Sequence, residues 1–152
     1  MKNLTMVLSL ACMLSIPLLT GCASLEKAPP VEEVVMQRLQ SLIDDVFAGD
    51  VDNVMDYVSE DFYHPEAPDK EALDAYIQMG RDMGFMDDVP AQLKEHEAEV
   101  DLDDAKVTVE GDTVSIYPIE VSTIMAFITA KLVYKKDSDG VWRVVTGEVE
   151  GI

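Results

Sequence analysis

Apolar side chains between residues 31 and 47 recur at intervals of three and four positions along the chain. They are Val31, Val34, Val35, Leu39, Leu42, Ile43, Val46 and Phe47. This spacing gathers them into one stripe along an α-helix, with polar residues on the opposite face. Gly49 supplies a stop, because glycine adopts the left-handed backbone conformation that ends many helices. The pattern therefore predicts a long amphipathic helix that begins at residue 31 and ends at Gly49.

Two shorter helices are predicted further along the chain. The first runs near 51–58, and its inner side is expected to carry Val54, Tyr57 and Val58. The second begins after a proline with Asp69, whose carboxylate can accept a hydrogen bond from the first helical turn. Its apolar residues recur at helical spacing, so we expect them to be its buried side. They are Ala72, Leu73, Tyr76, Ile77 and Met83.

After Pro90 the spacing of apolar residues changes from helical to alternating. One side of the chain then carries His96, Ala98, Val100 and Leu102, and the other carries Glu95, Glu97, Glu99 and Asp101. Such alternation is typical of a half-buried strand. Further strands are expected at 106–109, 113–117, 126–134 and 141–149, joined by short turns. Helices followed by antiparallel strands predict an α+β domain, with three helices packed on one side of an antiparallel sheet.

The amino-terminal segment has a different character. Lys2 precedes an almost uninterrupted apolar run over 4–19, too short for a comfortable membrane span and typical of a secretory signal. The stretch LTGC, which ends at Cys22, resembles the bacterial lipobox. This resemblance implies that 1–21 is a signal peptide and that Cys22 receives acyl chains. The alternative is an ordinary signal peptide cut nearby, which leaves Cys22 as a free thiol.

The lipobox resemblance also predicts where the protein resides. Several acyl chains on Cys22 make a lasting membrane anchor, 22–30 is the lipidated tether, and 31–152 is a single domain. Ala23 follows the cysteine, which in Gram-negative lipoproteins implies the outer membrane, facing the periplasm, with the inner membrane as the alternative. Cys12 falls in the segment that is removed, so the mature chain has no pair of cysteines for a disulfide.

Charge argues against two classes of partner. The chain has 30 acidic residues against 11 basic ones, a formal net charge of −19. Such a surface repels nucleic acid and anionic lipid headgroups, and we expect most of its acids to be solvated. Asp50 begins a stretch like a calcium loop, but Met55 stands where that loop needs glycine. The two histidines lack ligand spacing, so neither a metal nor a cofactor is expected.

Two stretches resemble the nuclear transport factor 2-like superfamily, which includes ketosteroid isomerase and the SnoaL-like polyketide cyclases. They are LIDDVFAGDVDNVMDYVSEDFYHPEAPDKEALDAYIQMG and KLVYKKDSDGVWRVVTGEV. The matching features are a glycine-acid turn at 49–50, an acid-aromatic stretch at 61–63, and an aspartate-glycine turn before Trp142 and Arg143. The resemblance covers roughly 34–149. It implies a cystatin-like cone of helices on a curved sheet that encloses a pocket, and it says little about activity.

The resemblance also raises the question of catalysis, because members of this superfamily range from isomerases and dehydratases to binders without catalysis. Its proton-transfer members pair a base with a hydrogen-bond donor that stabilises an oxyanion. The candidates for the base are Glu120 and His64, and those for the donor are Tyr63 and Tyr57. The parity of Glu120 with Val114 and Ile116 turns it inward only if Pro118 leaves the strand register unchanged, and a bulge at the proline returns it to solvent.

Ligand contacts are the other expected use of the pocket. The candidates are Tyr57, Tyr63, Tyr76, His96 and Met83. For each of them, packing in the core or at a loop rim is the competing interpretation. We predict a non-catalytic domain that binds a small apolar or amphipathic molecule or a protein partner. The alternatives are a proton-transfer enzyme of the isomerase, cyclase or dehydratase type, using Glu120 or His64 with a tyrosine, and a docking module without a ligand. The family resemblance further implies a homodimer.

Overall fold

The long helix predicted from the apolar spacing is α1, Val31–Ala48, in the computed structural model, which describes residues 28–151. Its stripe points at the sheet, and Val35 and Leu39 are almost completely buried. Gly49 ends the helix with a φ of 76°, in the left-handed conformation that glycine adopts without strain. The prediction is confirmed from its first residue to its cap.

The two shorter helices are also present, with differences in their buried faces. The first divides into α2, Val51–Val54, and the 3₁₀ turn η1, Met55–Tyr57. The second is α3, Lys70–Asp82, and the Asp69 carboxylate accepts a hydrogen bond of 2.8 Å from the Ala72 N–H, as expected. Tyr76 and Met83 are 52% and 62% exposed, however, so their predicted place on the buried side of the helix is wrong.

A fourth helix, α4, Val89–Glu95, lies where the alternating pattern predicted the approach to a strand. Pro90 sits in its first turn, where a proline has no lost hydrogen bond and its fixed φ suits the helix. His96 is the residue that ends this helix, and Glu97 has a positive φ of 49°. The predicted strand is therefore reduced to β1, Glu99–Asp101. The alternating residues 95–98 form the end of α4 and a turn instead of a strand.

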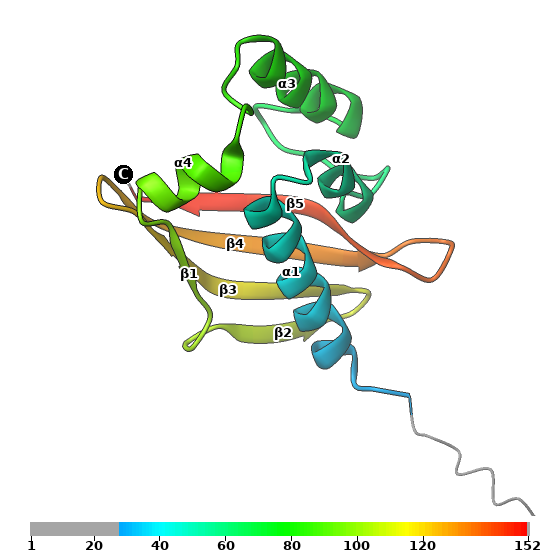
Figure 1. The fold of residues 1–152 in the computed structure, drawn as a ribbon. Helices are drawn as coiled ribbons and strands as arrows, with labels where there is room; N and C mark the ends of the chain where they lie inside the picture. The colour runs from blue at the N-terminus through cyan, green and yellow to red at the C-terminus, as the bar shows by residue number, and fades with distance from the viewer. Residues whose placement is uncertain (1–27, 152) are drawn as a thin grey trace, which may run out of the picture.

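The sheet is antiparallel throughout and has the strand order β1-β3-β4-β5, with β2 also paired to β3. The strands after β1 are β2, Lys106–Glu110; β3, Thr113–Ser122; β4, Phe127–Lys136; and β5, Trp142–Glu150. β1 and β2 pair with different halves of β3, so they lie in line along one edge. The helices pack on the sheet, and α1 crosses it as Figure 1 shows. The α+β cone fold is confirmed, with one helix more than predicted.

The core lies between α1 and the sheet. Its buried members are Val35, Leu39, Val114, Ile116, Ile119, Tyr134 and Val144. The strand register shifts between Ile116 and Ile119, across Pro118, which has no N–H to donate to a neighbouring strand. After the shift Ile119 takes the inward place that unbroken alternation would have given to Glu120. The core thus continues past the proline, with the parity of the strand reversed.

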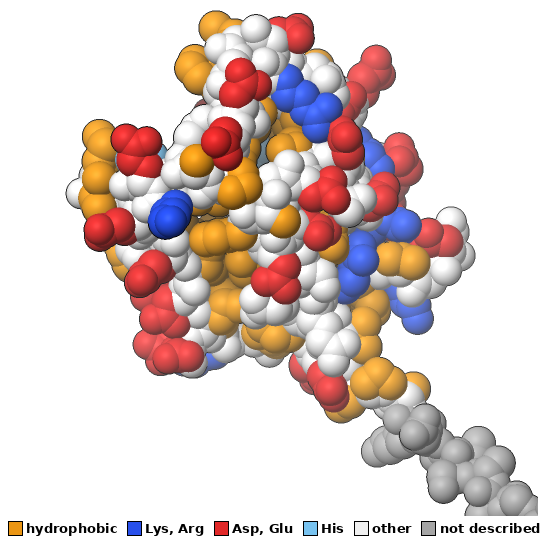
Figure 2. Space-filling model, viewed as in Figure 1, with side chains coloured by type: hydrophobic (Ala, Val, Ile, Leu, Met, Phe, Trp, Pro, Cys, Tyr) orange, Lys and Arg blue, Asp and Glu red, His pale blue; other side chains and the backbone are white. Residues whose placement is uncertain are grey.

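Residues 28–30 lead directly into α1, which begins at Val31. Cys22 and the predicted signal peptide lie outside the described residues. Within residues 28–151, no helix has both the length and the apolar character needed to span a bilayer. Acidic side chains are distributed over the face shown in Figure 2, in keeping with the acidic composition.

Candidate functional site

An apolar cavity of about 260 Å³ lies where the chain between α1 and α3 meets strands β4 and β5. Its lining is almost entirely carbon. The lining residues are Leu42, Val54, Tyr57, Val58, Phe62, His64, Leu73, Leu132, Val144, Gly147 and Val149. Ligand sites in proteins are typically concave and mostly apolar, with a few placed polar groups. Of the residues proposed from sequence for catalysis or binding, this cavity contains Tyr57 and His64.

A second depression of about 500 Å³ adjoins the apolar cavity, and both are open to solvent. The two share the wall residues Phe62, His64 and Leu73, and we call the adjoining pair the hollow. The outer part also includes Glu66 and Tyr76, which places Tyr76 at the entrance. We call the apolar part the inner cavity and the part that includes Glu66 and Tyr76 the outer cavity.

His64 is held in a closed turn at the boundary between the two cavities. Its backbone N–H donates to the Ala67 carbonyl, and its carbonyl accepts from the Ala67 N–H, both at 3.1 Å. The Glu66 N–H donates to Nδ1 of the ring at 3.2 Å. A neutral imidazole that accepts at Nδ1 carries its proton at Nε2. Within residues 28–151 no hydrogen bond to Nε2 is recorded, so Nε2 is the polar group that the inner cavity leaves free.

Tyr57 contributes its ring to the inner cavity, while its hydroxyl is bound elsewhere. The hydroxyl donates a 2.7 Å hydrogen bond to the Asp45 carboxylate, and the Arg38 guanidinium lies 4.3 Å from the ring centre. The hydrogen bond to the Asp45 carboxylate, together with burial, raises the pKa of the Tyr57 hydroxyl. An oxyanion partner needs a hydroxyl aimed at the ligand, and this one is engaged with Asp45.

Three further candidates stand apart from the hollow. Tyr63 is 59% exposed and borders neither the inner nor the outer cavity. Met83 follows the last turn of α3 and is exposed. His96 borders a different depression, between α4 and the turn that joins β3 to β4. The structure therefore brings together Tyr57, His64 and Tyr76, and separates them from Tyr63, Met83 and His96.

Glu120 lies on another part of the surface. The register shift at Pro118 gives it the opposite parity to Ile119 and Val121, which pack in or against the core. It pairs across the sheet with Asp101 and Thr129 and borders an open groove beside β1. Among the described residues, neither Glu120 nor His64 is hydrogen bonded to a tyrosine. Of the two outcomes foreseen for Glu120, the structure has the one in which the proline resets the parity.

The sequence analysis did not single out most of the cavity residues as ligand contacts; examples are Phe62, Leu73, Leu132 and Val149. Leu73 carried a partial signal, because helical spacing placed it on the inner side of α3. The other three come from a loop and two strands, and they meet only after the sheet has packed. An apolar residue in a cavity wall has the same sequence signature as one in a filled core, so no local pattern marks them.

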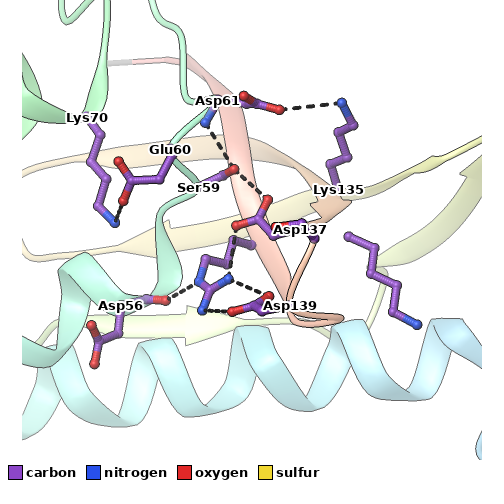
Figure 3. Close-up of a pocket in the computed structure, with 11 residues that line it drawn as sticks. Asp56, Ser59, Glu60, Asp61, Lys70, Lys135, Asp137 and Asp139 are labelled. Atoms are coloured by element: carbon purple, nitrogen blue, oxygen red, sulfur yellow. Dashed lines mark hydrogen bonds and ion pairs between the residues drawn. The ribbon is translucent and has the colours of Figure 1, made fainter.

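A polar cluster lies on the other side of the same chain segment, and Figure 3 shows its side chains converging. It consists of Ser59, Asp137, Asp139 and Arg143. Arg143 donates to Asp137 at 2.9 Å and to both carboxylate oxygens of Asp139 at 3.0 and 2.9 Å. The buried Ser59 hydroxyl donates to Asp137 at 2.7 Å. The cluster borders an open groove of about 690 Å³.

The charged groups of the polar cluster are paired, because the Arg143 guanidinium bonds both carboxylates. Hydrogen bonds from the Arg143 guanidinium lower the pKa of the Asp139 carboxyl to about 2, and the same contacts raise the pKa of Arg143. Nε of Arg143 donates to the Asp56 carbonyl at 3.1 Å. Across 28–151, no group of three or more His, Cys, Asp or Glu side chains is placed to hold a metal ion.

Comparisons with known proteins establish the fold. No protein-family model matches the chain. No curated protein sequence matches it either. Solved structures do match, among them the S. rosetta CaMKII hub, with 17% identity, a TM-score of 0.56, and coverage of 83% of this chain and 100% of the hub.

Two bacterial structures give the same result. An NTF2-like protein of unknown function from Shewanella baltica has 14% identity and a TM-score of 0.52, over 83% of this chain and 98% of its own. An NTF2-like protein with a cystatin-like fold from Novosphingobium aromaticivorans has 18% identity and a TM-score of 0.51, over 77% and 79%. The chain therefore has a nuclear transport factor 2-like fold. At these identities the likeness concerns the fold alone.

Proposed function

We propose that this protein is a lipid-anchored periplasmic lipoprotein whose domain holds a small apolar molecule in the inner cavity without transforming it. The observation that carries the proposal is the inner cavity, whose walls are apolar and which has one polar group without a recorded hydrogen bond, the His64 ring N–H. That combination matches general ligand sites, in which apolar walls provide affinity and a few polar groups fix orientation.

Support for binding rather than proton transfer comes from the positions of the groups that an enzyme would need. The Tyr57 hydroxyl is bonded to Asp45, and Tyr63 is exposed outside the hollow. Glu120 borders a groove that shares no residue with the inner cavity. A base and an oxyanion donor have to reach neighbouring atoms of one bound substrate, and these residues do not line one common site.

The binding proposal is tested by filling the hollow from Leu73, which lines both of its parts. In Leu73→Trp the larger side chain occupies the space that a ligand would take. We expect titration with the neutral fluorescent probe phenylnaphthylamine to show affinity at least about tenfold weaker than in the unmodified chain, a difference of about 1.4 kcal/mol. The protein used is residues 24–152, which contain every described helix and strand.

The matched control is Gln78→Trp, which places the same side chain on an exposed position of the same helix. It should leave the affinity for phenylnaphthylamine unchanged, and urea unfolding should confirm that both variants are folded. Equal binding by the Leu73 variant and the unmodified chain would contradict the proposal. Native mass spectrometry of the same protein after incubation with a periplasmic and membrane extract would then identify what the cavity retains.

Membrane anchoring is supported by the lipobox resemblance at Cys22 and by the short proline-containing tether before α1. The full chain, produced in a Gram-negative bacterium fed labelled palmitate, should carry the label and sediment with the outer membrane. Cys22→Ala should lose both properties. Cys12→Ala is the control, because that cysteine lies in the predicted signal peptide, and it should change neither. Labelling that persists in Cys22→Ala would contradict the anchoring proposal.

A further inference from the structure

The two adjoining parts of the hollow differ in the groups that they offer a ligand. The inner cavity is walled by α1, α3 and strands β4 and β5, and its side chains are apolar apart from the His64 ring and the engaged Tyr57 hydroxyl. The outer cavity adds Glu66 and the exposed Tyr76. A molecule that fills both parts therefore has an apolar body inside and a more polar end at the boundary, where His64 lies.

His64 is prepared to donate one hydrogen bond at that boundary. The turn 64–67 is closed by two backbone hydrogen bonds, and the ring is fixed by the bond from the Glu66 N–H to Nδ1. The free Nε2 group is therefore a donor whose direction is set before a ligand arrives. A donor held in place in this way costs little conformational entropy when it binds. The group that it recognises is a hydrogen-bond acceptor.

The charge around the hollow indicates which kind of acceptor His64 can bind. The chain carries a formal net charge of −19, and the Glu66 side chain lines the outer cavity within two residues of His64. No Lys or Arg is among the residues that line either part of the hollow. A carboxylate or phosphate head would therefore enter against repulsion and without a cation to pair with it. A neutral acceptor, such as a carbonyl or ether oxygen, has no such penalty.

We infer that the hollow takes a neutral amphiphile, with its apolar body in the inner cavity and one acceptor oxygen bonded to Nε2–H of His64. This inference rests on the proposed binding function and names the class of ligand. It requires that the uncharged acceptor contributes to affinity, that a charged head does not, and that the contribution depends on His64.

Three probes with the same carbon count separate these requirements: methyl hexyl ketone, octane and octanoate. They are titrated into residues 24–152 by displacement of phenylnaphthylamine at neutral pH. The ketone should bind about tenfold more tightly than octane, as one net hydrogen bond predicts, and more tightly than octanoate. His64→Leu keeps an apolar side chain at the boundary and removes the donor. It should abolish the preference for the ketone over octane.

Two variants guard against a trivial effect of the substitution. His96→Leu removes the other histidine, which borders a different depression, and should leave all three affinities unchanged. His64→Gln retains an N–H donor and should keep part of the preference for the ketone. Equal binding of ketone and octane by the unmodified chain, or tightest binding of octanoate, would overturn this inference and leave the binding proposal standing. Failure of every probe, with phenylnaphthylamine bound equally by Leu73→Trp, would overturn both.

Discussion

The segment from Val58 to Phe62 borders two regions of opposite character. Val58 and Phe62 turn toward the apolar inner cavity, whereas Ser59 and Asp61 turn toward the polar cluster and its groove. The cluster has the more conspicuous chemistry, with two carboxylates, a guanidinium and a buried hydroxyl within hydrogen-bond distance of one another. The inner cavity has a single free polar group.

The difference between the two regions lies in what is left unpaired. In the polar cluster each donor of Arg143 that the structure records is already bonded to Asp137, Asp139 or the Asp56 carbonyl. These contacts tie the turn between β4 and β5 to the loop after η1, which is a structural task. The inner cavity instead leaves space and one donor. A dense network of paired charges is therefore a weaker sign of a binding site than an apolar cavity with one donor free to bind a ligand.

The largest expected effect on the free energy of unfolding comes from removing the Asp137 carboxylate of the polar cluster. Asp137→Ala leaves the buried Ser59 hydroxyl without its acceptor and removes one carboxylate from Arg143. The Asp137 and Arg143 side chains are only 17% and 22% exposed. Leaving such groups unsatisfied costs about 1–3 kcal/mol. We expect urea unfolding to show a loss of that size, with affinity for phenylnaphthylamine unchanged, because the cluster lies outside the hollow.

An ion pair in the same groove provides the control. Lys70 and Glu60 are 2.9 Å apart, and the Glu60 side chain is 86% exposed. Exposed pairs contribute little to stability, so Glu60→Ala should change the free energy of unfolding by less than about 0.5 kcal/mol. If Asp137→Ala were as mild as Glu60→Ala, or if it weakened probe binding, the division into a structural region and a binding region would fail.

The parts of the fold that sequence predicts well are those set by local spacing. Helix α1 and its Gly49 end follow from residues within one or two turns of each other, as does the cap at Asp69. Helix α4 does not follow from the alternation after Pro90, because a proline also suits the first turn of a helix. The register shift at Pro118 depends on how β3 pairs with β4, which local spacing does not encode.

The candidate site was less predictable than the fold, for a physical reason. Sequence singled out His64, but its role depends on the turn that fixes Nδ1 and on Leu132 and Val149, which come from distant strands. Tyr57 is a plausible oxyanion donor from sequence, but in the structure its hydroxyl donates to the Asp45 carboxylate of α1. Whether a polar group is free or engaged is a property of the packed structure, and that property separates the two regions compared above.

The smallest expected effect is a pH-dependent change in the free energy of unfolding on substitution of Asp139. It tests whether charge holds the polar cluster together. The pKa of Asp139 is lowered from 3.8 to about 2, mainly by the hydrogen bonds from Arg143. A carboxyl with a depressed pKa in the folded state stabilises the protein above its unfolded pKa, and that contribution is lost as pH falls through the folded value. Asp139→Asn removes this titration and keeps an oxygen for the Val141 N–H.

The free energy of unfolding of the unmodified chain should therefore exceed that of Asp139→Asn by a constant amount near neutral pH, and the difference should shrink between about pH 4 and about pH 2. The Asp139 side chain is half exposed, so solvent and salt screen the interaction, and the difference should be smaller at high ionic strength. Urea unfolding across this pH range measures it. If the difference in free energy of unfolding stays constant with pH, the charge of Asp139 does not contribute to it. The hydrogen bonds, which the asparagine amide makes in part, would then hold the turn. A difference that shrinks would mean that paired charge holds it, because the amide carries none.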